Sequence, residues 1–168
     1  KLYGTEKIDS GNYIKIDSSG NIYLTGYTAG TFNDNISKGS YDAFFIKLDK
    51  DGEVLWVKQI GTSGADTSGS IVFDNDGNIY ISGYVDGSTE GTIDLGTPDA
   101  FIAKFTSDGT ELWLKRWGSE GFDITYRSIF HDEFIYIIGA TNGDVGGSGF
   151  FGGMYDTFLT KVDTSGNI

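Results

Sequence analysis

The sequence repeats with a period of 57 residues. An aspartate followed by a small residue and a phenylalanine recurs at 42–44, 99–101 and 156–158. Gly61 and Asp66 likewise recur at the same spacing, as Gly118 and Asp123. A period of this length, with several short strand patterns in each unit, is typical of a propeller-like array. Residues that recur in every copy are therefore explained first by architecture, and chemistry has to be sought where the copies differ.

Four segments of each repeat have the apolar, β-branched and aromatic composition of β-strands. Asp-Gly and Ser-Gly steps separate many of them, and glycine supplies the positive φ that tight hairpin turns require. The sequence thus predicts an all-β chain of three four-stranded antiparallel blades over residues 1–168. The strands predicted in the first two copies are 13–17, 21–28, 42–49 and 53–60, then 70–74, 78–85, 99–106 and 110–117.

Both faces of the predicted third strand are apolar. Phe44, Ile46 and Leu48 share one face, whereas Ala43 and Phe45 share the other. A sheet with one solvated face would alternate between apolar and polar residues. Sheets covered on both sides fit propeller blades, each packed between two neighbours. A β-trefoil or a β-prism is the alternative for a threefold repeat.

The repeat also resembles a known family. Its pattern is Asp42-Ala43-Phe44, Lys47-Leu48-Asp49 and Leu55-Trp56, then Gly61, Asp66, Gly77-Asn78-Ile79-Tyr80 and Gly83-Tyr84. This pattern is similar to the SBBP family of bacterial β-propeller repeats over essentially the whole chain. It is loosest in the third copy, where Asp132-Glu133-Phe134 lacks the Gly-Asn turn and Thr157 replaces the alanine. The resemblance implies a propeller in an exported or cell-surface bacterial protein, and it implies no activity.

Three blades do not close a ring of the usual four to eight. Two arrangements stay open: a slice of a six- or seven-bladed propeller, or half of a ring formed by self-association through blade faces or strand edges. Because the chain begins at Lys1 without a Met, we expect a mature protein or an excised piece. Lys1 to Gly4 should lie in an outermost strand beside the third strand of a blade, which is 156–163 in a self-contained chain.

The amino-acid composition argues against several classes of partner and site. The net charge of −12 argues against a nucleic-acid backbone, which requires clustered basic residues. We expect no membrane span because no apolar run reaches 18 residues. The absence of cysteine excludes disulfides and thiolate metal sites.

Several recurrent residues have both a structural and a functional interpretation. Asp74-Asn75-Asp76-Gly77-Asn78 resembles the opening of a Ca²⁺ loop, but Val85 stands where a bidentate glutamate is expected, so a hairpin turn is favoured. The acids of the turns between repeats are predicted to tie each loop to its neighbour, with a ring of carboxylates at a channel mouth as the alternative; they are Asp9, Asp66 and Asp123.

The single histidine and the tryptophans give no catalytic signal. His131 has no nucleophile or second imidazole in its surroundings in sequence. Trp56 and Trp113 share one repeat position, and Trp117 stands where Ile60 does, which favours packing between blades.

The loops between the second and third strands escape the repeat. They span 29–41, 86–98 and 142–155, and variable loops on a rigid scaffold are where binding is usually found. The candidate ligand-binding residues in these loops are Phe32, Asp34, Asp86, Asp94, Phe150 and Phe151. We expect a non-catalytic binding or scaffolding module for a protein or a polysaccharide. The alternatives are a carbohydrate-active hydrolase or lyase, and a structural spacer or filament component. We expect no cofactor.

Overall fold

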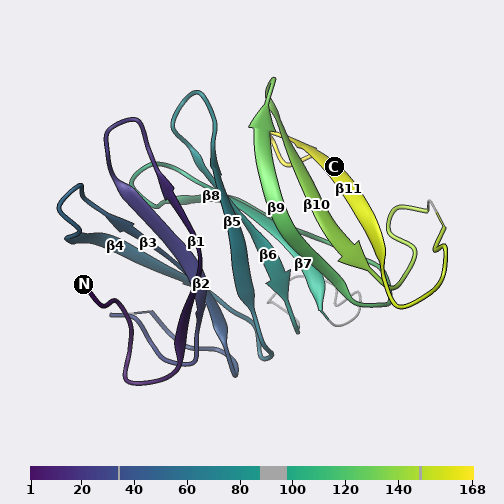
Figure 1. Ribbon diagram of the computed structural model, residues 1–168, viewed down its shortest axis with the longest axis horizontal. Coiled ribbons are helices and arrows are strands. Elements are labelled where there is room, and N and C mark those ends of the chain that lie inside the picture. Colours follow the sequence, from purple (N-terminus) through teal and green to yellow (C-terminus); the bar gives the residue numbers. More distant parts are fainter. Residues whose placement is uncertain (34, 88–97, 148) are drawn as a thin grey trace.

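The computed structural model describes residues 1–33, 35–87, 98–147 and 149–168. These residues form strands and loops and contain no helix, hence no helix that crosses a membrane. Three antiparallel sheets stand side by side (Figure 1). The strands are β1 (Asp9–Ile16), β2 (Ile22–Thr28), β3 (Asp42–Leu48), β4 (Val54–Ile60), β5 (Thr67–Phe73), β6 (Ile79–Val85), β7 (Asp99–Phe105), β8 (Glu111–Trp117), β9 (Asp123–His131), β10 (Phe134–Thr141) and β11 (Asp156–Asp163).

Each sheet is a meander in sequence order. The first sheet has the order β1-β2-β3-β4, the second β5-β6-β7-β8, and the third β9-β10-β11. The predicted propeller repeat is thus confirmed, with one difference in the third copy. The described part of that copy has three strands because only Ile168 follows the turn that closes at Asn167. Its β9–β10 hairpin turns on Asp132 and Glu133, both at positive φ, in place of an Asp-Gly step.

The first strand of each repeat begins earlier than its composition predicts. β1 starts at Asp9 rather than residue 13, and β5 starts at Thr67 rather than residue 70. A bulge interrupts the register between Gly11 and Tyr13, and another lies at the equivalent place in β5. The segments before the bulges are polar, so they carry no strand signal, yet their backbones pair with the ends of β2 and β6.

The core consists of the layers between sheets. Ala43 and Phe45 of the first sheet pack against Phe101 and Ala103 of the second. The other face of the second sheet, with Ile102, packs against the third. Both faces of the middle sheet are therefore buried, as blades in a propeller require. Among the described residues, the buried side chains form three separate clusters instead of one core shared by the three repeats, which excludes the trefoil.

The row of sheets is open. The two ends of the chain lie at opposite ends of it, beside the first and third sheets (Figure 1). Residues 1–4 form no strand and contact the β3–β4 hairpin of the first sheet. The prediction that they pair with residues 156–163 of the same chain is wrong, because three blades leave these segments far apart.

Candidate binding face

One side of the row of sheets is formed by the strand ends from which the variable loops leave. β2, β6 and β10 end there, and the turns that join one repeat to the next lie beside them (Figure 1). We call this side the loop face. The opposite side carries the short hairpin turns of each sheet.

The recurrent acids Asp9, Asp66 and Asp123 tie down the turns of the loop face. The backbone amide of Thr62 donates a hydrogen bond of 2.6 Å to Asp66, and the Thr62 hydroxyl donates another of 2.8 Å. Thr5 makes the same contacts to Asp9, and Ser119 makes them to Asp123. These bonds support the turn role, while a role for the three acids in ligand binding stays a prediction.

Asp66 differs from an ordinary surface carboxylate. Its side chain is almost fully buried, and Asp86 donates a further backbone hydrogen bond of 3.0 Å to it. Burial raises the pKa of Asp66 above its ordinary value, and the hydrogen bonds from Thr62 and Asp86 offset only part of this effect. The bonds hold Asp86, which directly follows β6, against the turn that precedes β5.

Aromatic rings line the loop face. The rings of Phe122 and Tyr155 are 5.7 Å apart and those of Phe122 and Tyr84 are 6.4 Å apart, so a row of rings crosses from the second sheet to the third. At the first sheet, the rings of Tyr27 and Tyr41 meet edge to face at 5.2 Å. We call these five residues the aromatic strip.

The strip is only partly buried. Tyr155 is 50% exposed, and the other four rings are half-buried. Burial, followed by the carboxylates of Asp86 and Asp66, raises the pKa of Tyr84. Sequence reasoning missed the strip, although Tyr27 and Tyr84 share one repeat position at the edge of the variable loops. That recurrence is the signal that would have found it.

The candidate residues of the loops have different environments. Phe32 is buried and packs on Phe44, with their ring centres 5.1 Å apart. Asp86 is half-buried, and its carbonyl oxygen accepts a hydrogen bond from Thr62. Asp34 and Asp94 lie outside the described residues. The structure therefore places Phe32 in the outer core of the first sheet.

The aromatic pair of the last loop is exposed. Phe151 is 93% exposed and Phe150 is 38% exposed. Met154 is 79% exposed beside them, and the backbone amide of Phe151 donates a hydrogen bond of 2.6 Å to Asp156. We call Phe150, Phe151 and Met154 the apolar projection; in the chain they precede Tyr155 of the aromatic strip.

On the side opposite the loop face, Asp74 stabilises the β5–β6 hairpin turn. It accepts hydrogen bonds from the backbone amides of Asp76 and Asn78, from the Asn78 side chain at 2.8 Å, and from the Tyr80 hydroxyl at 3.0 Å. Asp17 makes the equivalent set of contacts in the first sheet. Asp74, Asp76 and Asn78 are the residues that would hold a Ca²⁺ ion, and binding would require Asp74 to give up these bonds. The Ca²⁺ interpretation stays a hypothesis.

The tryptophans and the single histidine lie in surroundings that indicate no chemistry. Trp56 packs in the layer between the first two sheets, and Trp113 and Trp117 pack in the layer between the second and third, as predicted. His131 is exposed at the end of β9, with its Nε2 atom 3.2 Å from a carboxylate oxygen of Asp132. Neither the tryptophans nor His131 lie in a cluster of side chains that could carry out catalysis.

Comparison with known proteins agrees with this architecture. The SBBP family, described as a β-propeller repeat, matches residues 2–33 and 55–88. The chain is 25% identical over 141 residues to the regulatory protein FlaEY of Caulobacter vibrioides and 26% identical over 155 residues to the uncharacterized WD repeat-containing protein L264 of Acanthamoeba polyphaga mimivirus. Each similarity covers 77% of this chain, but only 15% and 11% of those two proteins.

Proposed function

We propose that this chain, which matches the SBBP β-propeller repeat at residues 2–33 and 55–88, is a non-catalytic binding module that holds a protein partner against the aromatic strip. The observation that carries the proposal is the row of rings formed by Tyr84, Phe122 and Tyr155, continued by the exposed Phe151 and Met154. A rigid stack of sheets presents these side chains, which is the arrangement that a binding surface needs.

The chemistry of the projection favours a protein over a polysaccharide. Aromatic residues and methionine are enriched at protein interfaces, and the unbranched Met154 side chain adapts to irregular apolar partners. A fully exposed phenylalanine such as Phe151 suits an anchor that enters a pocket of a partner.

The net negative charge of the chain indicates that its partner should carry positive charge. The net charge is −12, and exposed acids on the loop face include Glu6, Glu120 and Asp144. Complementary potentials accelerate association and exclude partners of like charge. The partner segment should therefore combine apolar or aromatic side chains with lysine or arginine. The exported setting implied by the family resemblance remains a prediction.

A peptide selection tests this proposal. The chain is panned against a phage-displayed library of random peptides, and we expect enrichment of sequences that carry basic and aromatic residues. The enriched peptide should bind at least about tenfold more weakly to the Phe151→Ser/Tyr155→Ser variant. The control is Leu112→Ser, because Leu112 is 50% exposed near the opposite end of β8.

Two results would overturn the proposal. One is a peptide that binds wild type and the Phe151→Ser/Tyr155→Ser variant equally well. The other is the absence of any enriched peptide while the same chain binds oligosaccharides on a glycan array through these residues.

A further inference from the structure

A polar cleft lies between the first and second sheets, on the side opposite the loop face. Its volume is about 480 Å³, and it is lined by the β1–β2 turn of the first sheet and the β5–β6 turn of the second, together with Lys47 and Ser107. Small-molecule sites are clefts of about 300–1,000 Å³. Both walls belong to an internal junction, so the shape of the cleft does not depend on what adjoins the first or the third sheet.

The two aspartates that close these turns are fully used by the fold. Each carboxylate oxygen of Asp17 accepts two hydrogen bonds, at 2.9–3.1 Å, from its own turn and from Tyr23. Each oxygen of Asp74 likewise accepts two, at 2.8–3.0 Å, from its own turn and from Tyr80. A carboxylate offers about four acceptor positions, so both groups are saturated. A bare cation would have to displace these donors, whereas a ligand that uses the remaining groups of the cleft would leave both turns intact.

The ammonium group of Lys47 is only partly used. It donates a hydrogen bond of 2.8 Å across the junction to the carbonyl oxygen of Ser107. Its repeat equivalent, Lys104, donates to Thr164 at 3.1 Å and also lies 3.6 Å from the carboxylate of Asp74. In the described part of the chain Lys47 has no carboxylate within ion-pair distance. Because an ammonium group has three donors, two remain for a ligand.

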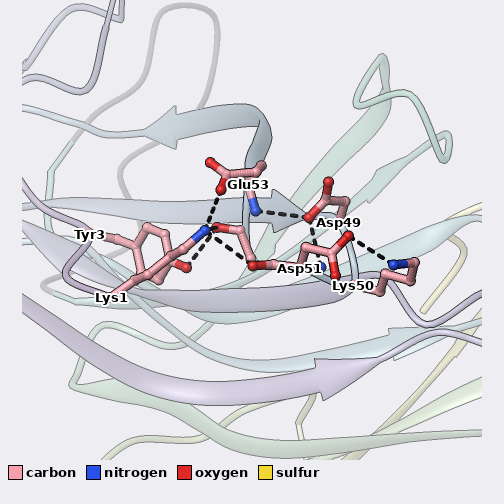
Figure 2. Close-up of polar contacts among 7 residues, drawn as sticks. Lys1, Tyr3, Asp49, Lys50, Asp51 and Glu53 are labelled. Carbon is pink, nitrogen blue, oxygen red and sulfur yellow. Dashed lines mark hydrogen bonds and ion pairs between the residues drawn. The ribbon is translucent and has the colours of Figure 1, made fainter.

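Asp76 contributes a carboxylate without a cation. It holds the position in the β5–β6 turn that Asp51 holds in the β3–β4 turn. There Asp51 pairs with Lys50 at 2.8 Å, and the neighbouring Glu53 pairs with Lys1 (Figure 2). Among the described residues, the side chain of Asp76 forms no such ion pair, although it lines the cleft beside the turn.

The second junction is closed at the equivalent place. The Asn75 side chain donates a weak hydrogen bond of 3.5 Å across that junction to Glu133. Ser18 and Asp76 stand 57 residues before this pair, and no hydrogen bond joins them in the described part of the chain, because serine is the shorter side chain. The cleft is therefore a feature of the first junction and not of the repeat.

The side-chain groups that the fold leaves to a ligand are mixed in character. One positive and one negative charge balance each other, and the other groups are neutral donors and acceptors. The half-buried ring of Phe73 adds an apolar patch. The polar groups are the hydroxyls of Ser18, Ser19 and Ser107, the side-chain oxygen of Asn21, the ammonium of Lys47 and the carboxylate of Asp76.

We propose that this cleft binds a neutral pyranose sugar, with Lys47 donating to its hydroxyl groups and Asp76 accepting from them. A sugar hydroxyl both donates and accepts, which matches a set of serine hydroxyls, an amide and two opposite charges. An apolar ligand would leave these polar groups desolvated without partners. An acidic sugar would bring its carboxylate among three aspartates, and like charges exclude a partner. The cleft lies away from the aromatic strip, so this inference does not rest on the proposed function.

A titration followed by amide correlation spectra of the isotope-labelled chain tests the proposal. The probes are methyl α-glucoside, methyl α-galactoside and methyl α-mannoside. We expect at least one of them to shift the amide signals of Ser18, Ser19, Asn75 and Asp76 saturably, with a Kd of about 1 mM, which is usual for a ligand of this size. Asp76→Ala should raise this Kd at least about tenfold, because a hydrogen bond to a charged group is lost. Asp51→Ala is the matched control and should leave the Kd unchanged.

A second variant closes the cleft without removing a turn contact. Ser18→Asn/Asp76→Glu recreates at the first junction the pair that Asn75 and Glu133 form at the second. We expect this variant to keep the circular dichroism and melting temperature of the wild type and to lose saturable sugar binding.

The inference would be overturned by the absence of amide shifts with all three sugars at about 100 mM. It would also be overturned by an equal Kd in wild type, Asp76→Ala and the closing variant, by shifts confined to the loop face, or by glucuronate binding more tightly than methyl α-glucoside. Asp76→Ala should still bind the selected peptide as wild type does, so failure of the sugar site and failure of the proposed function are recognised separately.

Discussion

The hydroxyl group of Tyr80 donates a hydrogen bond of 3.0 Å to the carboxylate of Asp74, and this bond joins a surface turn to the core. The Tyr80 ring is buried between the second and third sheets, while Asp74 closes the β5–β6 turn. Lys104 adds a charge 3.6 Å from the same carboxylate and lies over the Tyr80 ring. One carboxylate therefore couples hairpin geometry to the packing between blades.

We predict that Asp74→Ala lowers the free energy of unfolding by about 3 kcal/mol. The substitution removes the acceptor of several bonds at once and leaves the buried Tyr80 hydroxyl without its partner. Urea unfolding followed by tryptophan fluorescence measures the loss. Asp76→Ala is the control, because Asp76 is exposed in the same turn, and an equal loss there would contradict the role of the carboxylate.

The contribution of Asp74 should also depend on pH. Burial opposes its ionisation, but the hydrogen bonds from Asn78 and Tyr80, together with the nearby charge of Lys104, outweigh burial and lower the pKa of Asp74 below the usual value. A carboxylate with a lowered pKa stabilises the fold above the unfolded-state pKa of about 3.9, and this contribution is lost as the pH falls through the folded-state pKa.

The stability difference between wild type and Asp74→Ala should accordingly stay constant from about pH 7 to pH 5 and shrink below about pH 4. Comparing the two proteins at each pH cancels the general effect of the acidic net charge. A difference that grows on acidification would show that the carboxylate acts in its protonated form.

Much of the fold can be predicted from the repeat, because periodicity, hairpin glycines and two apolar strand faces all point to stacked four-stranded sheets. The polar starts of β1 and β5 could not be predicted, since residues such as Ser10 and Ser68 enter strands through backbone pairing alone. The position of residues 1–4 also depends on where the neighbouring blade lies, which no single repeat specifies.

The candidate site was less predictable, because the sequence does not distinguish an aromatic residue exposed on a variable loop from one buried in the core. Phe32 and Phe151 both follow glycine-containing segments, yet one is buried against Phe44 and the other is 93% exposed. Long-range packing decides between these outcomes. The strip residues Tyr27 and Tyr84 were overlooked because they sit in strands whose other residues belong to the core.

Gly83 is a further point where the repeat demands a particular residue. A Cβ atom there would lie 1.9 Å from the carbonyl oxygen of Thr67 and 2.9 Å from the Phe101 ring. Because backbone and a packed ring both block the space, Gly83→Ala should lower the free energy of unfolding by more than about 3 kcal/mol.

Gly11→Ala is the matched control for this substitution. Gly83 lies in the β5–β6 pair of the second sheet, and Gly11 lies in the β1–β2 pair of the first sheet, but nothing stands within 4 Å of an added Cβ atom at Gly11. Chemical unfolding of both variants makes the comparison. If Gly83→Ala is as stable as Gly11→Ala, the close approach of β5 and β6 does not constrain the fold.

Phe150 and Phe151 act either as an exposed anchor for a partner or as a hydrophobic lid over the neighbouring sheet, and substituting both residues distinguishes these two roles. Replacing both with serine should lower the free energy of unfolding by less than about 2 kcal/mol, because Phe151 is 93% exposed and Phe150, at 38% exposed, is only partly buried. Binding of a selected peptide should weaken at least about tenfold in the same variant. Phe32→Ser, which empties a buried site against Phe44, is the contrasting change and should cost about 3 kcal/mol. A loss of that size in the double variant would mean that the two rings close down over the third sheet in solution and stabilise the fold instead of recruiting a partner.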